Sequence, residues 1–334
     1  MTALFALAIM PFIAHAQFML PGFSGAARIA MDPSYPRPGD TVKLSLESSL
    51  IDLDTSSLSW RIDGKPIPST DKTITTIAGP LGSVTSIDAQ ITTREGSVIS
   101  TSASIVPTRI DILYDGNSYV PPFYEGRALP AAGGTFKLEA VPYFKKQSGA
   151  SVPVSDIIFT WKRNGEVIGS VSGRGKASVI ISSPYLFGHD TITVNAESVD
   201  GSFTGETSII VSSAEPVVRL YEDHPLYGLR LDQAIATTSS IIGHEVTLSA
   251  IPFFSTARTP TDDALTYDWR VNGMSISTGD DTKNSLTLGA PAGGQANLSV
   301  SLSHATNIFF SADAAWTILF SDTAVRKNPF SQPN

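Results

Sequence analysis

The sequence contains no cysteine in 334 residues. A chain without cysteine forms no disulfide, and it offers no thiolate nucleophile and no thiolate ligand for zinc or an iron–sulfur cluster. Basic residues are also few, since 23 Lys and Arg stand against 31 Asp and Glu and give a formal net charge of −8. Nucleic-acid binding depends on cations that neutralise phosphates, so this balance argues against a nucleic-acid partner.

Catalytic motifs are missing as well. The sequence has no G-x-S-x-G elbow, no P-loop and no glycine-rich dinucleotide motif, and its five histidines show no metal-ligand spacing. Three acidic pairs do not recur at equivalent places, and we interpret them as solvated loop charge rather than as calcium sites. They are Asp52 with Asp54, Asp262 with Asp263, and Asp280 with Asp281. We predict no enzyme activity, no cofactor and no metal site, while a converging carboxylate pair of the glycosidase kind stays open.

Long apolar runs are absent except at the N-terminus. Residues 2–14 form an apolar run interrupted only by Pro11, and the run ends in the A-x-A site Ala14-His15-Ala16. This pattern predicts a signal peptide over residues 1–16 and a secreted or cell-envelope location. No Lys or Arg precedes the run, so an ordinary buried segment is the alternative interpretation. Beyond residue 20 no stretch reaches the ~18 apolar residues of a membrane span, so membrane attachment requires an uncleaved N-terminal segment.

The composition that remains is typical of a globular β protein. Hydrophobic residues make up 42% of the chain and charged residues 16%, which is enough apolar surface for folding and too little charge for disorder. The 26 Gly and 22 Pro suit many short strands joined by turns. The length exceeds what one hydrophobic core usually supports and predicts two or three domains.

A tryptophan followed by a turn occurs three times. Residues 60–64, 161–165 and 269–273 share the form W-[RK]-x-[DN]-G, spaced by about the length of one small domain. Asp-Gly and Asn-Gly pairs suit tight turns with positive φ. Alternating apolar and polar residues predict a strand before and another after each tryptophan, and Pro80, Pro184 or Pro291 marks a crossing loop in each copy.

This order of strands, turn and crossing loop predicts a Greek-key sandwich. Residues 60–67 resemble the third strand and turn of immunoglobulin-like domains, and the segments at Trp161 and Trp269 are similar to the same region of bacterial Ig-like and PKD-like repeats. The resemblance implies an all-β chain of three tandem immunoglobulin-like (PKD-like) Greek-key β-sandwiches after an N-terminal signal segment. Two features depart from it: the cysteine pair of antibody-type domains is missing, and W-[RK]-x-[DN]-G replaces the usual PKD turn.

The repeats predict three domains over residues 25–107, 108–214 and 215–322, with a C-terminal tail over 323–334. The second and third begin with similar connectors that are rich in proline and aromatic residues. We interpret these aromatics as an interdomain surface, and the alternative is a surface that binds a partner. They are Tyr114, Tyr119, Phe123, Tyr124, Tyr221 and Tyr227.

The three tryptophans are predicted to be core residues, because the residues at i±2 that share their sheet face are mostly apolar. A sugar-stacking platform is the alternative for Trp60, Trp161 and Trp269. An export signal, tandem sandwiches and absent catalytic motifs together predict a non-catalytic surface or envelope protein that mediates adhesion or assembly with a protein or glycan partner. A purely structural spacer and an accessory module of a secreted hydrolase are the alternative functions.

Overall fold

A computed structural model describes residues 26–290 and 293–321. The predicted signal peptide, Pro291 and the tail over 323–334 lie outside the described residues. The chain divides into two compact units, one over residues 1–107 and 146–149, the other over 108–145 and 150–334.

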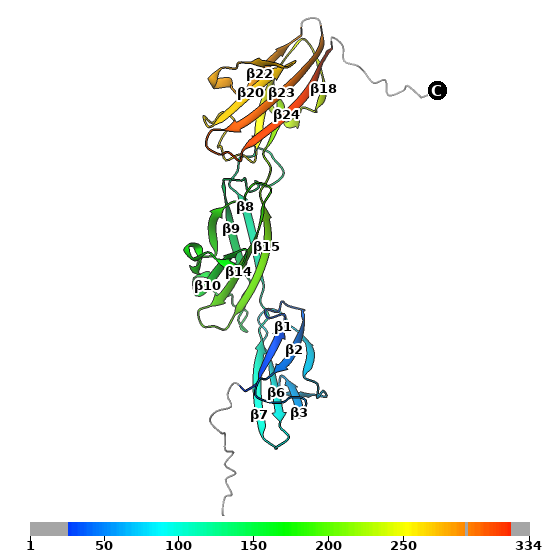
Figure 1. The fold of residues 1–334 in the computed structure, drawn as a ribbon, viewed down its shortest axis with the longest axis vertical. Helices are drawn as coiled ribbons and strands as arrows, with labels where there is room; N and C mark the ends of the chain where they lie inside the picture. The colour runs from blue at the N-terminus through cyan, green and yellow to red at the C-terminus, as the bar shows by residue number, and fades with distance from the viewer. Residues whose placement is uncertain (1–25, 291–292, 322–334) are drawn as a thin grey trace, which may run out of the picture. The chain divides into compact units, whose positions relative to one another are not determined.

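The first unit is a sandwich of two antiparallel sheets with the strand orders β1-β2-β5 and β4-β3-β6-β7 (Figure 1). Alternation in β2 and β6 places Val42, Leu44, Ile87 and Ile91 between the sheets, where they are buried with Trp60. The strands are β1 (Arg28–Asp32), β2 (Thr41–Glu47), β3 (Ser57–Ile62), β4 (Lys65–Ile67), β5 (Thr73–Ile77), β6 (Thr85–Thr92) and β7 (Val98–Ile105).

The second unit begins with a sandwich of the same strand order. Its sheets are β13-β9-β8 and β11-β10-β14-β15, with β12 beside β10. Phe136, Phe159 and Trp161 are fully buried. The elements are β8 (Ile110–Gly116), β9 (Thr135–Pro142), η1 (Val154–Asp156), β10 (Ile157–Arg163), β11 (Glu166–Val167), η2 (Gly169–Val171), β12 (Gly173–Arg174), β13 (Ser178–Ser182), β14 (His189–Ser198) and β15 (Thr204–Ser212).

A third sandwich completes the second unit and adds two strands to the shared order. Its sheets are β17-β16-β19-β22 and β18-β24-β23-β20-β21, and β18 pairs with β24 in parallel. Neither β17 nor β18 was predicted. The elements are β16 (Val217–His224), β17 (Gly228–Ala234), β18 (Thr238–Ile242), β19 (Glu245–Phe253), β20 (Leu265–Val271), β21 (Met274–Ile276), η3 (Asp280–Thr282), β22 (Ser285–Gly289), β23 (Gly294–His304) and β24 (Ser311–Ser321).

The three sandwiches share their central tryptophan geometry. Each ring is buried, and each indole Nε1 donates a hydrogen bond to a main-chain oxygen 11 to 15 residues downstream. The acceptors are Asp71 O at 2.8 Å, Lys176 O at 2.9 Å and Lys283 O at 2.9 Å. A buried indole therefore leaves no polar atom unpaired in any copy.

The tight turns follow the predicted geometry. Asn164 and Gly165 have φ values of 52° and 88°, and the equivalent pairs at 63–64 and 272–273 also have positive φ at both residues. Two consecutive residues with positive φ characterise the hairpin turn that fits the right-handed twist of the strands. The predicted all-β chain of tandem immunoglobulin-like sandwiches is confirmed by this shared strand order.

Candidate binding site

The second and third sandwiches meet through a backbone bridge. The segment between β8 and β9 reaches the end of β19, where Tyr119 N donates to Ser255 O at 2.7 Å and Phe254 N donates to Tyr119 O at 2.8 Å. Tyr124 packs edge-on against Phe253, with ring centroids 5.5 Å apart. Main-chain hydrogen bonds in both directions make this a short piece of shared β structure within the second unit.

The six aromatic residues singled out in the sequence lie in different environments. Tyr221 is buried, and burial raises the pKa of Tyr119 and Tyr221. Tyr114 lies under the guanidinium group of Arg127, 3.9 Å from the ring centroid. The structure therefore places Tyr119 and Tyr124 in the bridge and Tyr221 in a small cluster beside it.

The remaining two aromatics of that set are exposed. Phe123 has 91% of its surface accessible, and Tyr227 has 78%. Tyr227 rests on His224, with ring centroids 4.7 Å apart. Neither lines a cavity found in the described residues near the bridge.

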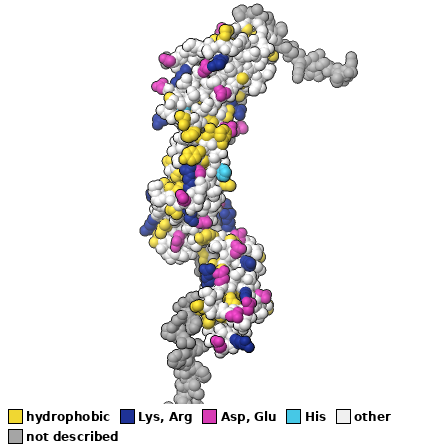
Figure 2. All heavy atoms as spheres, viewed as in Figure 1, with side chains coloured by type: hydrophobic (Ala, Val, Ile, Leu, Met, Phe, Trp, Pro, Cys, Tyr) yellow, Lys and Arg dark blue, Asp and Glu magenta, His cyan; other side chains and the backbone are white. Residues whose placement is uncertain are grey.

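A groove of about 460 Å³ lies beside the bridge. Hydrophobic side chains gather on the surface where the second and third sandwiches meet (Figure 2). The second sandwich supplies most of the groove lining from the ends of β10, β13 and β14, and the third supplies Phe309. The lining residues are Gly133, Gly134, Arg163, Asn164, Ser182, Ser183, Tyr185, Asp190 and Phe309.

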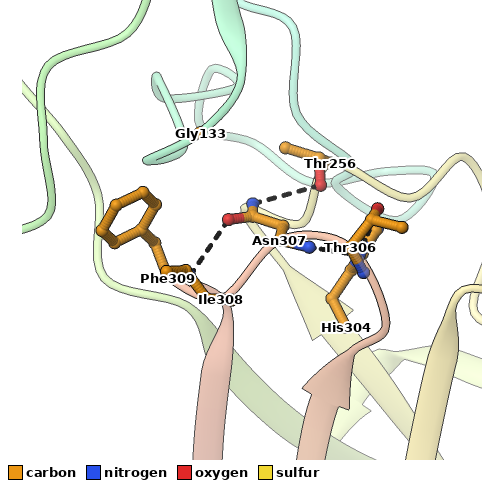
Figure 3. A pocket seen from close by; sticks show the side chains of 7 residues that line it. All are labelled: Gly133, Thr256, His304, Thr306, Asn307, Ile308 and Phe309. Atoms are coloured by element: carbon orange, nitrogen blue, oxygen red, sulfur yellow. Dashed lines mark hydrogen bonds between the residues drawn. The ribbon is translucent and has the colours of Figure 1, made fainter.

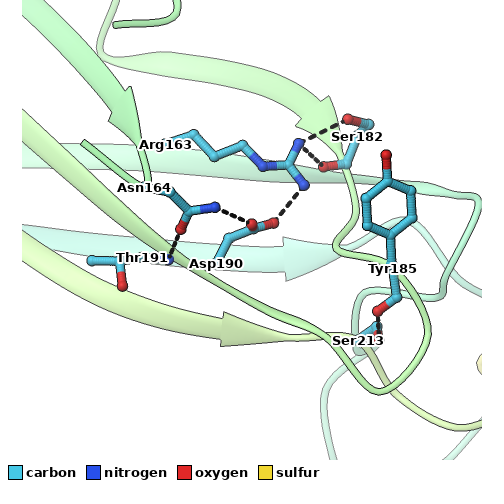
Figure 4. A network of polar contacts seen from close by, with 7 residues as sticks. All are labelled: Arg163, Asn164, Ser182, Tyr185, Asp190, Thr191 and Ser213. Atoms are coloured by element: carbon cyan, nitrogen blue, oxygen red, sulfur yellow. Dashed lines mark hydrogen bonds and ion pairs between the residues drawn. The ribbon is translucent and has the colours of Figure 1, made fainter. Parts of the chain in front are cut away.

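An ion pair forms the polar wall of the groove (Figure 4). Arg163 Nη2 donates to Asp190 Oδ2, and Asn164 Nδ2 donates to Asp190 Oδ1 at 2.8 Å. Arg163 Nη1 also donates to Ser182 O at 3.3 Å and to Ser182 Oγ at 3.0 Å. Asp190 is only 6% exposed. Its carboxylate accepts from two donors and neutralises the positive charge of Arg163.

The charged pair belongs to the second sandwich alone among the three copies. Arg163 pairs with Ile192 across the sheet, as Ile62 pairs with Ile87 and Val271 with Leu298. Arg163 therefore occupies the place of an isoleucine and a valine. Two residues before those partners, Asp190 occupies the place of Thr85 and Ala296.

A buried hydroxyl also distinguishes the second copy. Ser183 N donates to Gly134 O at 2.9 Å, as Ala78 N donates to Asp40 O and Ala290 N to His244 O. Ser183 therefore stands where the other sandwiches have alanine. Its Oγ is buried and has no hydrogen-bond partner among the described residues. An unpaired buried hydroxyl costs about 1–3 kcal/mol, so its presence in the groove requires an explanation.

Two aromatic rings stand at the mouth of the groove. Tyr185 is 78% exposed and Phe309 38%, with ring centroids 6.5 Å apart. The carbonyl oxygen of Tyr185 accepts from Gly188 N at 2.8 Å and from Ser213 Oγ at 2.6 Å, which holds the loop between β13 and β14. Tyr185 follows Pro184 in the predicted crossing loop, and neither ring is among the site residues predicted from the sequence.

The same loop contains a strained aromatic residue. Phe187 has a φ of 60° and is 75% exposed. A bulky residue in the left-handed region is an outlier that costs of order 1–3 kcal/mol and tends to mark a functional segment. Phe187 is therefore a second exposed aromatic side chain on the loop that carries Tyr185.

A smaller cavity of about 230 Å³ adjoins the groove and shares Gly133 and Phe309 with it (Figure 3). Asn307 is buried here, and its Nδ2 donates to Ala132 O at 2.9 Å. Asn307 Oδ1 accepts from Phe309 N at 3.1 Å. Asn307 therefore connects the second sandwich to the loop that presents Phe309.

Three members of the acidic pairs identified in the sequence, Asp52, Asp54 and Asp262, have local partners. Asp52 Oδ1 accepts from Asp54 N at 2.9 Å, and Asp54 forms an ion pair with Lys72. Asp262 accepts from the main-chain N–H groups of Ala264 and Arg258, which lowers the pKa of its carboxyl. Within residues 26–290 and 293–321, no group of three or more His, Asp or Glu side chains is placed to hold a metal ion.

No protein-family model matches the chain, and no curated protein sequence matches it. Solved structures of tandem sandwiches are similar to it. The three N-terminal domains of the highly immunogenic outer capsid protein of bacteriophage RB49 are 11% identical, with a TM-score of 0.25 over 90% of this chain and 99% of that chain. The central fibronectin-III array of RIM-binding protein is 10% identical, with a TM-score of 0.31 over 88% and 96%.

A glycan-bound structure is also similar. The Bacteroides ovatus protein SGBP-B of a mixed-linkage glucan utilization locus, in complex with a mixed-linkage heptasaccharide, is 13% identical, with a TM-score of 0.24 over 86% of this chain and 65% of that chain. At identities this low, the similarity to these three structures is a similarity of fold alone. No helix among the described residues is long and apolar enough to cross a membrane.

Proposed function

We propose that this chain is an exported, non-catalytic binding protein that mediates adhesion or assembly at the cell envelope through the groove of the second sandwich. One observation carries the proposal: residues that differ from the other two copies gather at a single exposed groove. Arg163, Asp190 and Ser183 replace apolar residues, alanine or threonine at equivalent positions. Arg163 and Asp190 compensate each other's charge, whereas the hydroxyl of Ser183 forms no hydrogen bond that the fold uses.

The composition of the groove supports binding rather than catalysis. Arg163 and Asp190 pair with each other, and Asn164 Oδ1 accepts from Thr191 N as the equivalent turn residues do in the other copies. Both oxygens of the carboxylate therefore accept a hydrogen bond from the protein, which stabilises its charged form. Exposed aromatic side chains at the mouth are favoured anchors for a partner.

The test is binding of the purified full chain to an envelope fraction prepared from its source cells, followed by biolayer interferometry. Tyr185→Ser removes an exposed ring from the groove, and we expect retention to fall at least tenfold. Tyr227→Ser is the matched control because Tyr227 has the same exposed fraction but lies outside the groove. Equal retention of both variants, or no retention of the unaltered chain, contradicts the proposal.

A spacer function has its own supporting observation. The bridge between the second and third sandwiches uses main-chain hydrogen bonds and the buried Asn307, a geometry suited to fixing two domains rather than to capturing a partner. A pure spacer predicts that Tyr185→Ser leaves retention unchanged, while shortening the chain by one sandwich changes reach without abolishing any contact.

Export is tested separately by fractionating the source cells and sequencing the native N-terminus. We expect a chain that starts at Gln17 outside the cytoplasm, because Ala14-His15-Ala16 matches the small-residue cleavage site of a secretory signal. An intact Met1 in the cytoplasm contradicts the envelope location and favours an intracellular scaffold.

A further inference from the structure

We infer that the groove of the second sandwich binds an uncharged oligosaccharide, with a sugar ring against Tyr185 and Phe309 and sugar hydroxyls on the polar wall. This inference rests on the proposed binding function and names its ligand class. The cavity of about 460 Å³ lies within the ~300–1,000 Å³ of small-molecule sites. Four features of the groove favour this ligand over a charged one or a peptide.

Charge is the first feature. Arg163 is the cation that lines the groove, and Asp190 neutralises it at hydrogen-bond distance. Asn164 and Ser182 hold the pair from both sides and are themselves neutral. An anionic ligand would have to compete with a buried carboxylate for the guanidinium, which costs several kcal/mol when the pair is broken. The groove is therefore matched to a ligand without charge.

The unpaired hydroxyl is the second feature. Ser183 is only 8% exposed, and its Oγ has no hydrogen-bond partner among the described residues. A hydroxyl both donates and accepts, as sugar hydroxyls do. The two sister sandwiches have alanine at this position, so the fold does not require an oxygen there. The Oγ is itself buried, so a ligand hydroxyl pairs with it when the Ser183 side chain turns toward the groove that this residue lines.

The aromatic pair is the third feature. Tyr185 and Phe309 are inclined at 59° with centroids 6.5 Å apart, so they present two ring faces rather than one stacked pair. The apolar C–H face of a sugar ring gains dispersion and hydrophobic contact on such a surface while its hydroxyl rim stays polar. An apolar ligand would leave the polar wall unpaired, whereas a sugar uses both surfaces.

The state of the neighbouring strand edge is the fourth feature. β13 is the outer strand of its sheet, and an extended peptide would bind it through free main-chain groups. At the groove, Ser183 N is used by the ladder towards β9, where it donates to Gly134 O. The outward-facing Ser182 O already accepts from Arg163 Nη1. Strand addition at this point would have to displace Arg163 from Ser182, which disfavours a peptide.

The experiment applies the full chain to a glycan array of neutral, sialylated and sulfated oligosaccharides, followed by calorimetry with the best neutral oligosaccharide. We expect binding to neutral oligosaccharides that is insensitive to salt. Ser183→Ala should weaken affinity about fivefold, which corresponds to one lost hydrogen bond, and Tyr185→Ala about tenfold, which corresponds to one lost aromatic contact. Tyr227→Ala should leave the affinity unchanged.

Thermal unfolding separates a binding role from a structural one. Ser183→Ala introduces the residue found in the sister sandwiches and removes an unpaired polar atom, so we expect its unfolding midpoint to stay equal or rise while its affinity falls. Loss of stability together with affinity overturns the role assigned to Ser183.

The remaining outcomes separate this inference from the proposed function. Binding only to charged glycans, or to none while Tyr185→Ser still abolishes retention by the envelope fraction, overturns the neutral-sugar inference and leaves the proposed function standing. If the chain binds no glycan on the array and is not retained by the envelope fraction, both the neutral-sugar inference and the proposed function are overturned.

Discussion

At the scale of single residues, each sandwich has one central tryptophan. Its ring is buried in the core, and its indole N–H donates a hydrogen bond to a main-chain oxygen. Trp161 is fully buried, and its Nε1 donates to Lys176 O. Trp161→Ala removes the ring, leaves a cavity and unpairs the Lys176 carbonyl. We expect a loss of about 3–5 kcal/mol in the free energy of unfolding, measured by urea denaturation. Phe123→Ala is the control, because a side chain that is 91% exposed should change stability by less than about 0.5 kcal/mol.

Tyr267 adds a pH-dependent contribution. Its hydroxyl donates to Pro260 O at 2.7 Å, and burial raises the pKa of this phenol above its usual range. Below about pH 10 the phenol is neutral in both states, so its contribution is fully present. Above that pH the unfolded chain loses the proton first, and stability falls by up to about 1.4 kcal/mol per pH unit until the folded phenol ionises.

Tyr267→Phe removes this titration. We expect the variant to be about 1 kcal/mol less stable near pH 7, because it lacks the hydrogen bond to Pro260, and to show a shallower loss of stability above pH 10. Urea denaturation at several alkaline pH values measures both effects. The variant still loses some stability at alkaline pH, because burial also raises the pKa values of Tyr119 and Tyr221. Parallel stability curves would show that Tyr267 does not titrate as proposed.

At the scale of elements, the turn after β10 tests how much the hairpins depend on glycine. Gly165 has a φ of 88°, and a Cβ built there meets no atom within 4 Å. Gly165→Ala should therefore cost about 1–2 kcal/mol through backbone strain alone. Gly169 is the matched control, because its Cβ also meets open space while its φ is not in the left-handed region. If urea denaturation gives the two variants the same free energy of unfolding, backbone strain at residue 165 is refuted.

The same elements explain which parts of the fold were predictable. Alternation around Trp60, Trp161 and Trp269 and the following Asp-Gly or Asn-Gly pair are local signals, and they identified the central strands and turns. β17 and β18 were missed because their residues are mostly exposed or half-buried and lack a clear apolar face. β18 is placed by pairing in parallel with β24, a contact distant in sequence.

The groove was less predictable for a related reason. Tyr185 and Phe309 are more than 100 residues apart, and nothing in either local sequence indicates that the rings meet. Arg163 stands at the variable position of the motif that identified the repeat, so the sequence alone aligns it with Ile62 and Val271. Its partner Asp190 lies outside the motif and is aligned through strand register. Position-by-position differences between aligned copies are the signal that would have selected Arg163 from sequence.

At the scale of the whole molecule, each of the two units has a hydrophobic core of its own, and the second unit contains two sandwiches. Separate cores predict separate unfolding transitions. Within the second unit, the bridge at Tyr119 and the buried Asn307 join the two sandwiches across a contact that either would lose on unfolding. We therefore expect the second and third sandwiches to unfold together in differential scanning calorimetry.

Asn307→Ala tests that coupling. The substitution removes the hydrogen bond to Ala132 O, whose residue is buried, and the acceptor for Phe309 N, so it leaves polar groups unpaired at a cost of about 1–3 kcal/mol. That cost falls on the junction, and neither sandwich core contains Asn307. The joint transition should therefore broaden or split, while that of the first unit stays in place. Gln295→Ala is the control, because the exposed side chain of Gln295 bonds to Asn297 within the same sandwich. An unsplit transition shifted equally in both variants would mean that Asn307 does not couple the sandwiches.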